Sequence, residues 1–196
     1  SSLAFGDING DGSNMELAVG ATRFADDFDI QHGAGSNPNG IGAVWILSLD
    51  TAGVVQAAGQ KIDTSSLLGL EVGDQFGSSI ALIKDFDGSG KKVLAVGAAR
   101  DDDSFTDGGA VYLLFLAKNA VTVATFQKIS AASGNFDGEF VAKLLFGRSI
   151  APVGDVNGDG VQDLIVGAPG EGIAHGAVYI LMLDSSGTVA SQNKIS

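Results

Sequence analysis

The sequence predicts an all-β protein made of β-propeller blades, each a four-stranded antiparallel sheet. Three observations support this prediction: the chain of 196 residues repeats itself three times, each repeat holds short runs of β-branched and aromatic residues between glycines, and no segment shows the periodicity of an amphipathic helix. Glycine occupies 29 positions and proline 3, while 45% of the residues are hydrophobic, so the composition fits a globular core and not a flexible linker.

Each repeat contains the same short motifs in the same order. The third reads FGRSI (146–150), DVNGDG (155–160), DLIVGAP (163–169) and GAVYILML (176–183); the second reads FGSSI (76–80), DFDGSG (85–90), VLAVGAA (93–99) and GAVYLLFL (109–116); the first reads DINGDG (7–12), ELAVGAT (16–22) and GAVWILSL (42–49). The first repeat lacks the Phe-Gly opening and carries an insertion around residues 32–40. We therefore expect a single domain, 1–196, with repeats of about 1–75, 76–145 and 146–196.

The loop between the first and second strands of each repeat holds the candidate metal ligands. In the third repeat, positions 1, 3, 5 and 9 of this loop are Asp155, Asn157, Asp159 and Asp163. Alternate oxygen side chains on a glycine-containing turn point inward, and the carbonyl of Val161 at position 7 would complete a ligand set of the kind that calcium prefers. Three carboxylates within about 5 Å repel by roughly 3 kcal/mol per pair at an effective dielectric constant of 20, and a bound cation removes that cost. The sequence therefore predicts a Ca²⁺ site here.

The corresponding loops of the other two repeats match less well. The ligand set expected in the first repeat is Asp7, Asn9, Asp11, Ser13 and Glu16, in which one inserted residue moves the last acid to position 16. In the second repeat, Asp85 and Asp87 are followed by Ser89, two lysines and then a valine where an acid belongs, so we expect this third site to be weak or empty. Two Ca²⁺ sites are thus predicted, with the third repeat ranked slightly above the first.

Two other interpretations of these loops were weighed against calcium binding. An EF-hand needs a glutamate at position 12 and flanking helices, whereas position 12 of the third loop is Val166 in an apolar run, so an EF-hand is excluded. The remaining alternative is that aspartate and asparagine before glycine only build Asx-turns in a hairpin.

The ordered recurrence of these motifs resembles the FG-GAP repeat. The resemblance covers the whole chain and is carried by Phe-Gly at 76–77 and 146–147, by the aspartate-rich loop, and by Gly-Ala-Pro at 167–169. It implies the blade fold of the seven-bladed β-propeller in integrin α-subunits, calcium held in the hairpin loops, and ligands or partner domains on the opposite face. The departures from the pattern are Thr22 and Ala99 in place of the proline, and the altered second loop.

Three blades cannot close a ring, because propellers contain about 4–8. We therefore interpret the sequence as a partial propeller cut from a longer array. The expected partners are the other blades of a longer chain or a second copy that closes the propeller, together with an unidentified protein or glycan ligand.

The composition and charge of the chain argue against several classes of function. The formal net charge of −12 and the absence of cysteine argue against nucleic-acid binding, thiol catalysis and cysteine-ligated zinc. No apolar run approaches the roughly 18 residues of a membrane span, and no nucleophile–base or acid pair occurs outside the aspartate loops. We predict a non-catalytic, calcium-binding segment for extracellular recognition, adhesion or structural assembly, secreted or at the cell surface, because cytosolic calcium would leave such sites empty. The alternative is an accessory or catalytic propeller of a secreted hydrolase or lyase.

Other charged and aromatic residues receive structural interpretations. The acidic runs at 26–29 and 101–103 are interpreted as solvated loop tips, with an extended cation-binding surface as the alternative. The arginines that precede these runs, Arg23 and Arg100, are interpreted as offsetting their negative charge. Trp45, Tyr112 and Tyr179 align after Gly-Ala-Val, which indicates a repeated packing role.

Overall fold

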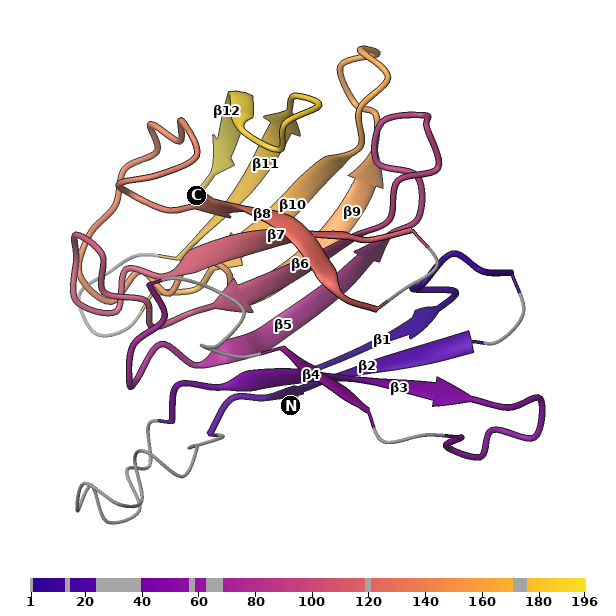
Figure 1. The fold of residues 1–196 in the computed structure, drawn as a ribbon. Coiled ribbons are helices and arrows are strands. Elements are labelled where there is room, and N and C mark those ends of the chain that lie inside the picture. The colour runs from indigo at the N-terminus through magenta and orange to yellow at the C-terminus, as the bar shows by residue number, and fades with distance from the viewer. Residues whose placement is uncertain are drawn as a thin grey trace.

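Three four-stranded antiparallel sheets make up the computed structural model of the chain (Figure 1). The structure describes residues 2–12, 15–23, 40–56, 59–62, 69–118, 121–170 and 176–196. The strands are β1 Leu3–Gly6, β2 Met15–Ala21, β3 Ala43–Leu49 and β4 Gln60–Ile62 in the first sheet; β5 Phe76–Ile83, β6 Val93–Ala98, β7 Ala110–Leu116 and β8 Val123–Ile129 in the second; and β9 Ser149–Gly154, β10 Asp163–Ala168, β11 Ala177–Leu183 and β12 Val189–Ile195 in the third.

Each sheet is a meander in which every strand pairs with the next one along the chain. This order confirms the predicted all-β fold and the partial propeller with four strands per blade. Within the described ranges no helix is long and apolar enough to cross a membrane. The insertion predicted at residues 32–40 lies outside the described residues, except for Gly40.

Glycine in the second strand lets adjacent sheets approach closely. A Cβ atom on Gly20 of β2 would lie 2.2 Å from the carbonyl oxygen of Gly77, and one on Gly97 of β6 would lie 2.0 Å from that of Gly147. Those two carbonyls belong to the Phe-Gly motifs, and each accepts a hydrogen bond of 2.7 Å from a serine hydroxyl, of Ser2 and Ser79 respectively. The Phe-Gly and Gly-Ala motifs therefore recur because they form the contact between neighbouring blades.

The hydrophobic core lies between the sheets. One cluster joins the first and second sheets and includes Ile46 and Leu94, and another joins the second and third and includes Phe115 and Leu164. The second sheet is thus covered on both faces, and every residue of β6 and β7 is buried. In contrast, Leu3 in β1 is 63% exposed, because the outer face of the first sheet has no neighbouring blade among the described residues.

Two of the three aligned aromatic residues, Tyr112 and Tyr179, have the packing role that the sequence predicted. Tyr112 lies edge-on to Phe76 with ring centroids 5.5 Å apart, and Tyr179 lies edge-on to Phe146 at 5.7 Å. The phenylalanine of each Phe-Gly motif therefore packs against the tyrosine of the third strand.

Candidate metal centres

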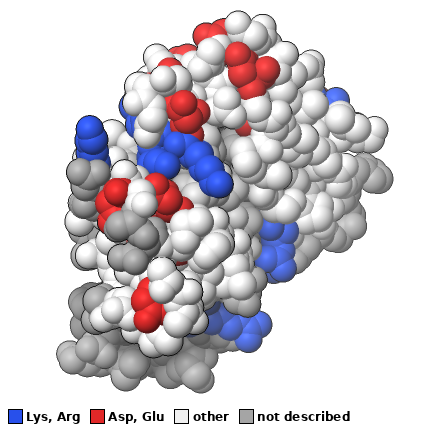
Figure 2. Space-filling model, turned by 90° about the vertical axis from the view of Figure 1, so that its right-hand side faces the viewer, with Lys and Arg blue, Asp and Glu red and all other residues white. Residues whose placement is uncertain are grey.

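The three aspartate loops lie at the same end of the sheets, where β1, β5 and β9 turn into β2, β6 and β10 (Figure 1). Figure 2 shows this side of the molecule, on which acidic and basic side chains lie next to one another. The two glycines of each loop have positive φ angles, which are 74° and 71° in the first loop, 75° and 80° in the second, and 80° and 89° in the third. The three loops therefore share left-handed glycines at the same two positions, whatever their side chains.

In the third loop the predicted ligands hold the turn by hydrogen bonds. Asp155 accepts bonds from the amides of Gly158 and Gly160 at 2.7 and 2.8 Å, and the amide nitrogen of the Asn157 side chain donates to Asp159 at 2.8 Å. The backbone amide of Val161 donates to the other carboxylate oxygen of Asp159 at 2.8 Å. These contacts are the Asx-turn network that the sequence also allows.

Asp163 differs from these exposed residues because it is fully buried at the start of β10. One carboxylate oxygen accepts the amide of Val156 at 2.8 Å, and the other accepts the amide of Leu183 at 3.0 Å. The carboxylate therefore ties the loop to β11, and both of its oxygens have a backbone donor.

The first loop repeats this arrangement with one difference. Glu16 is fully buried at the start of β2, and its Oε2 accepts the amides of Ile8 at 2.8 Å and Asn9 at 3.2 Å. Its Oε1 is buried and has no hydrogen-bond partner in the part of the chain that the structure describes. Burial raises the pKa of Glu16 above its ordinary value, and the carboxylates of Asp11 and Asp7 add to that rise. A buried carboxylate oxygen without a donor, whose charge is further opposed by two other carboxylates, is an electrostatic arrangement that a cation would relieve.

The second loop holds an ammonium group among its carboxylates. Lys91 forms an ion pair with Asp87, whose other oxygen accepts the hydroxyl of Ser89. The hydrogen bond from Lys91 lowers the pKa of Asp87 below its ordinary value. Asp85 accepts the amide of Gly90 at 2.7 Å. The lysine that the sequence placed in this loop therefore contacts the carboxylate that a metal would need.

The three loops also differ in what accepts the amide hydrogen at loop position 2. In the first and third loops the acceptor is the buried carboxylate of Glu16 or Asp163. In the second loop it is the backbone carbonyl of Lys91, which the amide of Phe86 contacts at 2.9 Å. A carbonyl thus replaces the missing acid, so the same turn forms without a third buried charge.

The donor set of the first and third loops suits a hard cation, because it consists of carboxylate, amide and carbonyl oxygens. Within the described part of the chain, no three His, Cys, Asp or Glu side chains come together as a group that could hold a metal ion. The physical reason is local: the oxygens of Asp7 and Asp155 accept backbone amides at 2.7 Å, and Asn9, like Asn157, donates its side-chain NH₂ to the next aspartate. Ser13 lies outside the described residues.

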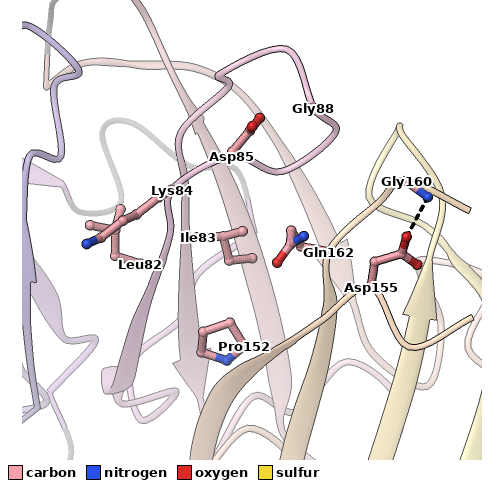
Figure 3. Close-up of a pocket in the computed structure, with 9 residues that line it drawn as sticks. All are labelled: Leu82, Ile83, Lys84, Asp85, Gly88, Pro152, Asp155, Gly160 and Gln162. Atoms are coloured by element: carbon pink, nitrogen blue, oxygen red, sulfur yellow. Dashed lines mark hydrogen bonds between the residues drawn. The ribbon is translucent and has the colours of Figure 1, made fainter. Parts of the chain in front are cut away.

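A cavity of about 560 Å³ separates the second and third loops. Figure 3 shows Asp85 and Asp155 on its opposite walls, with Gln162 between them and Asp155 bonded to Gly160 of its own loop. The backbone amide of Gln162 donates to the carbonyl of Phe86 at 2.8 Å, which connects the two loops. Each aspartate therefore belongs to its own loop, and the two do not form a shared site.

At the other end of the second sheet, the acidic run at 101–103 departs from its sequence interpretation. Asp102 and Asp103 are exposed as expected, but Asp101 is 2% exposed, so the prediction of a solvated loop tip was wrong for that residue. Lys128 pairs with Asp101 at 2.9 Å and with Asp103 at 2.7 Å. The signal for this pair was the Gln-Lys-Ile sequence that ends the repeat, whose lysine lies opposite Tyr112 in the sheet. The acidic run at 26–29 lies outside the described residues.

Comparison with known proteins identifies the repeats. The FG-GAP repeat model matches residues 146–181. The chain is 36% identical over 156 residues to integrin α-3 of Cricetulus griseus (79% of this chain, 13% of that protein), 30% identical over 200 residues to integrin α-PS2 of Drosophila melanogaster (99% and 12%), and 29% identical over 192 residues to integrin α-IIb of Mus musculus (95% and 16%). The chain thus spans less than a fifth of the length of these relatives. With three blades, two complete Phe-Gly motifs and this similarity along most of its length, the chain is an integrin α-like FG-GAP repeat protein.

Proposed function

We propose that the chain is a non-catalytic, calcium-binding part of a β-propeller that serves extracellular recognition, adhesion or structural assembly. The observation that supports the metal proposal is the buried Oε1 of Glu16, which has no hydrogen-bond donor among the described residues and whose charge is opposed by those of Asp7 and Asp11. Burying a charged oxygen without a partner is costly, and a cation is the partner that the neighbouring carboxylates favour.

The residues proposed to hold calcium are those at the odd positions of each loop, together with the buried acid at the start of the next strand. They are Asp7, Asn9, Asp11, Ser13 and Glu16 in the first loop, and Asp155, Asn157, Asp159, Val161 and Asp163 in the third. A bound calcium ion would neutralise these carboxylates and hold each hairpin closed. Glu16 and Asp163 already fix the start of the loop to the strand that follows, so each positions the remaining oxygens of its turn.

The middle loop is proposed to be weak or empty. Its remaining oxygens come from Asp85, Asp87 and Ser89, and Lys91 supplies a positive charge in the place where a cation would bind. A second cation beside that ammonium would be repelled, and Val93 offers no oxygen at the position of the buried acid.

Exposed apolar side chains on the outer faces of the first and third sheets support the proposed assembly partners. Leu3 and Phe5 on the first sheet are 63% and 58% exposed, and Val178 on the third sheet is 37% exposed. The equivalent face of the second sheet is buried against its neighbours. We propose that the chain is one partial propeller domain, and that further blades, from a longer chain or from a second copy, cover these faces.

The extracellular location belongs to the same proposal. Sites with a dissociation constant near 10⁻⁴ M are filled in millimolar calcium and empty in the cytosol. The relatives are integrin α-subunits, which supports a role in adhesion, with a protein or glycan ligand still to be identified.

Unfolding in urea with 1 mM calcium or with a chelator tests the proposal. Each site with a dissociation constant near 10⁻⁴ M adds about 1.4 kcal/mol to the free energy of unfolding, so calcium should add about 2.8 kcal/mol in total. Asp159→Ala should lose about half of that gain, whereas the matched variant Asp87→Ala should keep all of it. Equal losses in both variants, or no gain from calcium in the wild type, would contradict the assignment of the sites.

Static light scattering of the same samples tests the assembly. A second copy would give twice the mass of the chain, and a Phe5→Asp variant, which places a charge on the exposed face of the first sheet, should return it to a monomer. If the chain is a monomer at all concentrations, further blades of a longer chain must cover the outer sheet faces. A dimer that persists in the Phe5→Asp variant would contradict the proposal that the exposed face of the first sheet forms the dimer contact.

A further inference from the structure

All three arginines of the chain line one pocket of about 280 Å³. Its walls are formed by Thr22, Arg23, Gln75, Ala99, Arg100, Leu145 and Arg148. The chain has 11 basic and 23 acidic residues, so a concentration of every guanidinium group in one small hollow runs against its overall charge.

The fold brings these residues together from all three blades. Arg23 follows the end of β2 and Arg100 follows the end of β6, while Arg148 immediately precedes β9. In an antiparallel meander these positions lie at the end of the sheets opposite to the aspartate loops (Figure 1). The pocket is therefore separate from the proposed metal sites and shares no residue with them.

Two residues of the pocket wall have strained backbones in equivalent places. Gln75 has a φ angle of 57° and Leu145 one of 59°, and each immediately precedes the phenylalanine of a Phe-Gly motif. The turns are closed by hydrogen bonds of 3.0 Å from the amide of Ser78 to the carbonyl of Gln75 and of 3.1 Å from the amide of Arg148 to that of Leu145. Positive φ angles in non-glycine residues are unfavourable and persist where the surrounding structure holds them, so this wall is fixed and not loose.

The charges of the pocket are only partly compensated. Arg100 donates from Nη1 to Asp107 Oδ2 at 2.9 Å. Among the residues that the structure describes, no ion pair involves Arg23 or Arg148, which are both exposed, whereas the more buried Lys128 at this end has two carboxylate partners. Two of the three guanidinium groups thus have no carboxylate partner within the described ranges, which leaves positive charge in the pocket on a chain of net charge −12.

We propose that this pocket binds a single oxyanionic group, a sulfate, phosphate or carboxylate. A guanidinium group presents planar, paired N–H donors that match two oxygens of such a group, and these charge-assisted hydrogen bonds are about twice as strong as neutral ones. The volume is below the roughly 300 Å³ at which pockets for drug-sized ligands begin, so the site accommodates one charged group of a ligand. The inference stands independently of calcium binding, because it uses a different set of residues.

The experiment is a titration of the chain with sodium sulfate, sodium phosphate or sodium acetate, with sodium chloride at matched ionic strength as the blank. The readout is the arginine Nε–H region of a ¹H–¹⁵N NMR spectrum, in which three arginines give three resonances. Saturable binding should move all three resonances with one dissociation constant. The anion that binds most tightly distinguishes a sulfate or phosphate ligand from a carboxylate ligand.

Two variants distinguish specific binding in the pocket from a general attraction of anions to positive charge. Arg148→Gln removes an exposed cation of the pocket and should raise the dissociation constant about tenfold, the loss of one charge-assisted hydrogen bond. Lys118→Gln makes the same change of net charge in the β7–β8 hairpin and should leave it within about twofold. Urea unfolding of both variants, with Arg23→Gln as a second pocket variant, verifies that they fold. Equal weakening by Lys118→Gln, or shifts no larger than those in chloride, would overturn the proposal.

Discussion

The middle aspartate loop and the two outer ones have glycines with positive φ at the same positions but differ in their charged side chains. All three carry two glycines with φ between 71° and 89°, so the turn does not depend on which charges it holds. The outer loops bury a carboxylate, Glu16 or Asp163, beneath that turn, whereas the middle loop uses the carbonyl of Lys91 and adds its ammonium group. The comparison shows that glycines recur at the same two positions of every loop and that only the outer loops bury an acid. A lysine lies near an aspartate in two of the loops, because Lys91 pairs with Asp87 and Lys92 lies 3.8 Å from Asp7. The buried acid is therefore the feature that separates the proposed cation sites from the middle loop.

The largest effect is expected from removing the buried acid of the third loop. Asp163→Ala deprives the buried amide of Leu183 and the partly buried amide of Val156 of their acceptor, and an unsatisfied buried amide costs about 1–3 kcal/mol. We expect a loss of about 1–4 kcal/mol in the free energy of unfolding, measured in urea with a chelator present. The middle loop offers the matched control, because Val93→Ala at the equivalent position removes no hydrogen bond. A loss below about 1 kcal/mol for Asp163→Ala would mean that the buried acid does not hold the loop.

A buried carboxylate outside the loops should make the free energy of unfolding depend on pH. Asp74 is 3% exposed, and burial raises its pKa to about 7. The folded chain then holds a proton that the unfolded chain releases above its ordinary pKa, so stability falls as the pH rises from about 4 to about 7. At about 1.4 kcal/mol per pKa unit, the fall from this residue is at most about 4 kcal/mol.

Asp74→Asn tests this pH dependence because asparagine keeps an acceptor for the amide of Glu71, which Asp74 binds at 2.7 Å. The variant should gain stability relative to the wild type between pH 4 and pH 7, measured by urea unfolding at each pH with a chelator present. Parallel curves for the two proteins would show that Asp74 does not retain its proton in the folded state.

Glu16→Gln is expected to separate the two roles of the buried acid, which are to accept backbone hydrogen bonds and to supply a negative charge. The glutamine carbonyl can still accept the amides of Ile8 and Asn9, so the chain should fold with unchanged stability in a chelator. The calcium stoichiometry measured by isothermal titration calorimetry should fall from two to one, and the stabilisation by calcium should fall by about 1.4 kcal/mol. Two bound ions in this variant would mean that the buried glutamate is not a ligand.

The smallest effect is expected from Lys91→Ala in the middle loop. The ion pair with Asp87 lies at the surface and is partly exposed, so it contributes about 0–1 kcal/mol and stability should barely change. The calcium stoichiometry should remain two, because Val93 still supplies no oxygen. A third ion bound by this variant would show that the ammonium group alone, and not the missing acid, keeps calcium out of the loop.

Much of the fold was predictable from sequence because the repeat is local. The glycines and β-branched runs fixed the positions of the four strands, and the alignment of Tyr112 with Tyr179 gave their packing role before any contact was known. The residues of the aspartate loops were equally visible, since they lie within ten positions of one another.

Contacts between blades were not predictable, because they join residues distant in the sequence. Nothing local indicates that Gly97 approaches Gly147, or that Arg23 and Arg148 share a pocket. Each contact depends on how one twisted sheet stacks on the next, which the periodicity within a repeat does not specify. The prediction for Asp101 was wrong for a different reason, because its partner Lys128 comes from β8 of the same sheet, two strands further along the chain.

The central claim is that the first and third loops bind calcium and the middle loop does not. The most direct measurement is anomalous X-ray diffraction from crystals grown in saturating calcium. The account predicts one strong peak within the oxygens of the loop that begins at Asp7, another in the loop that begins at Asp155, and none in the loop that begins at Asp85. Water in both outer loops, or an ion beside Lys91, would contradict it.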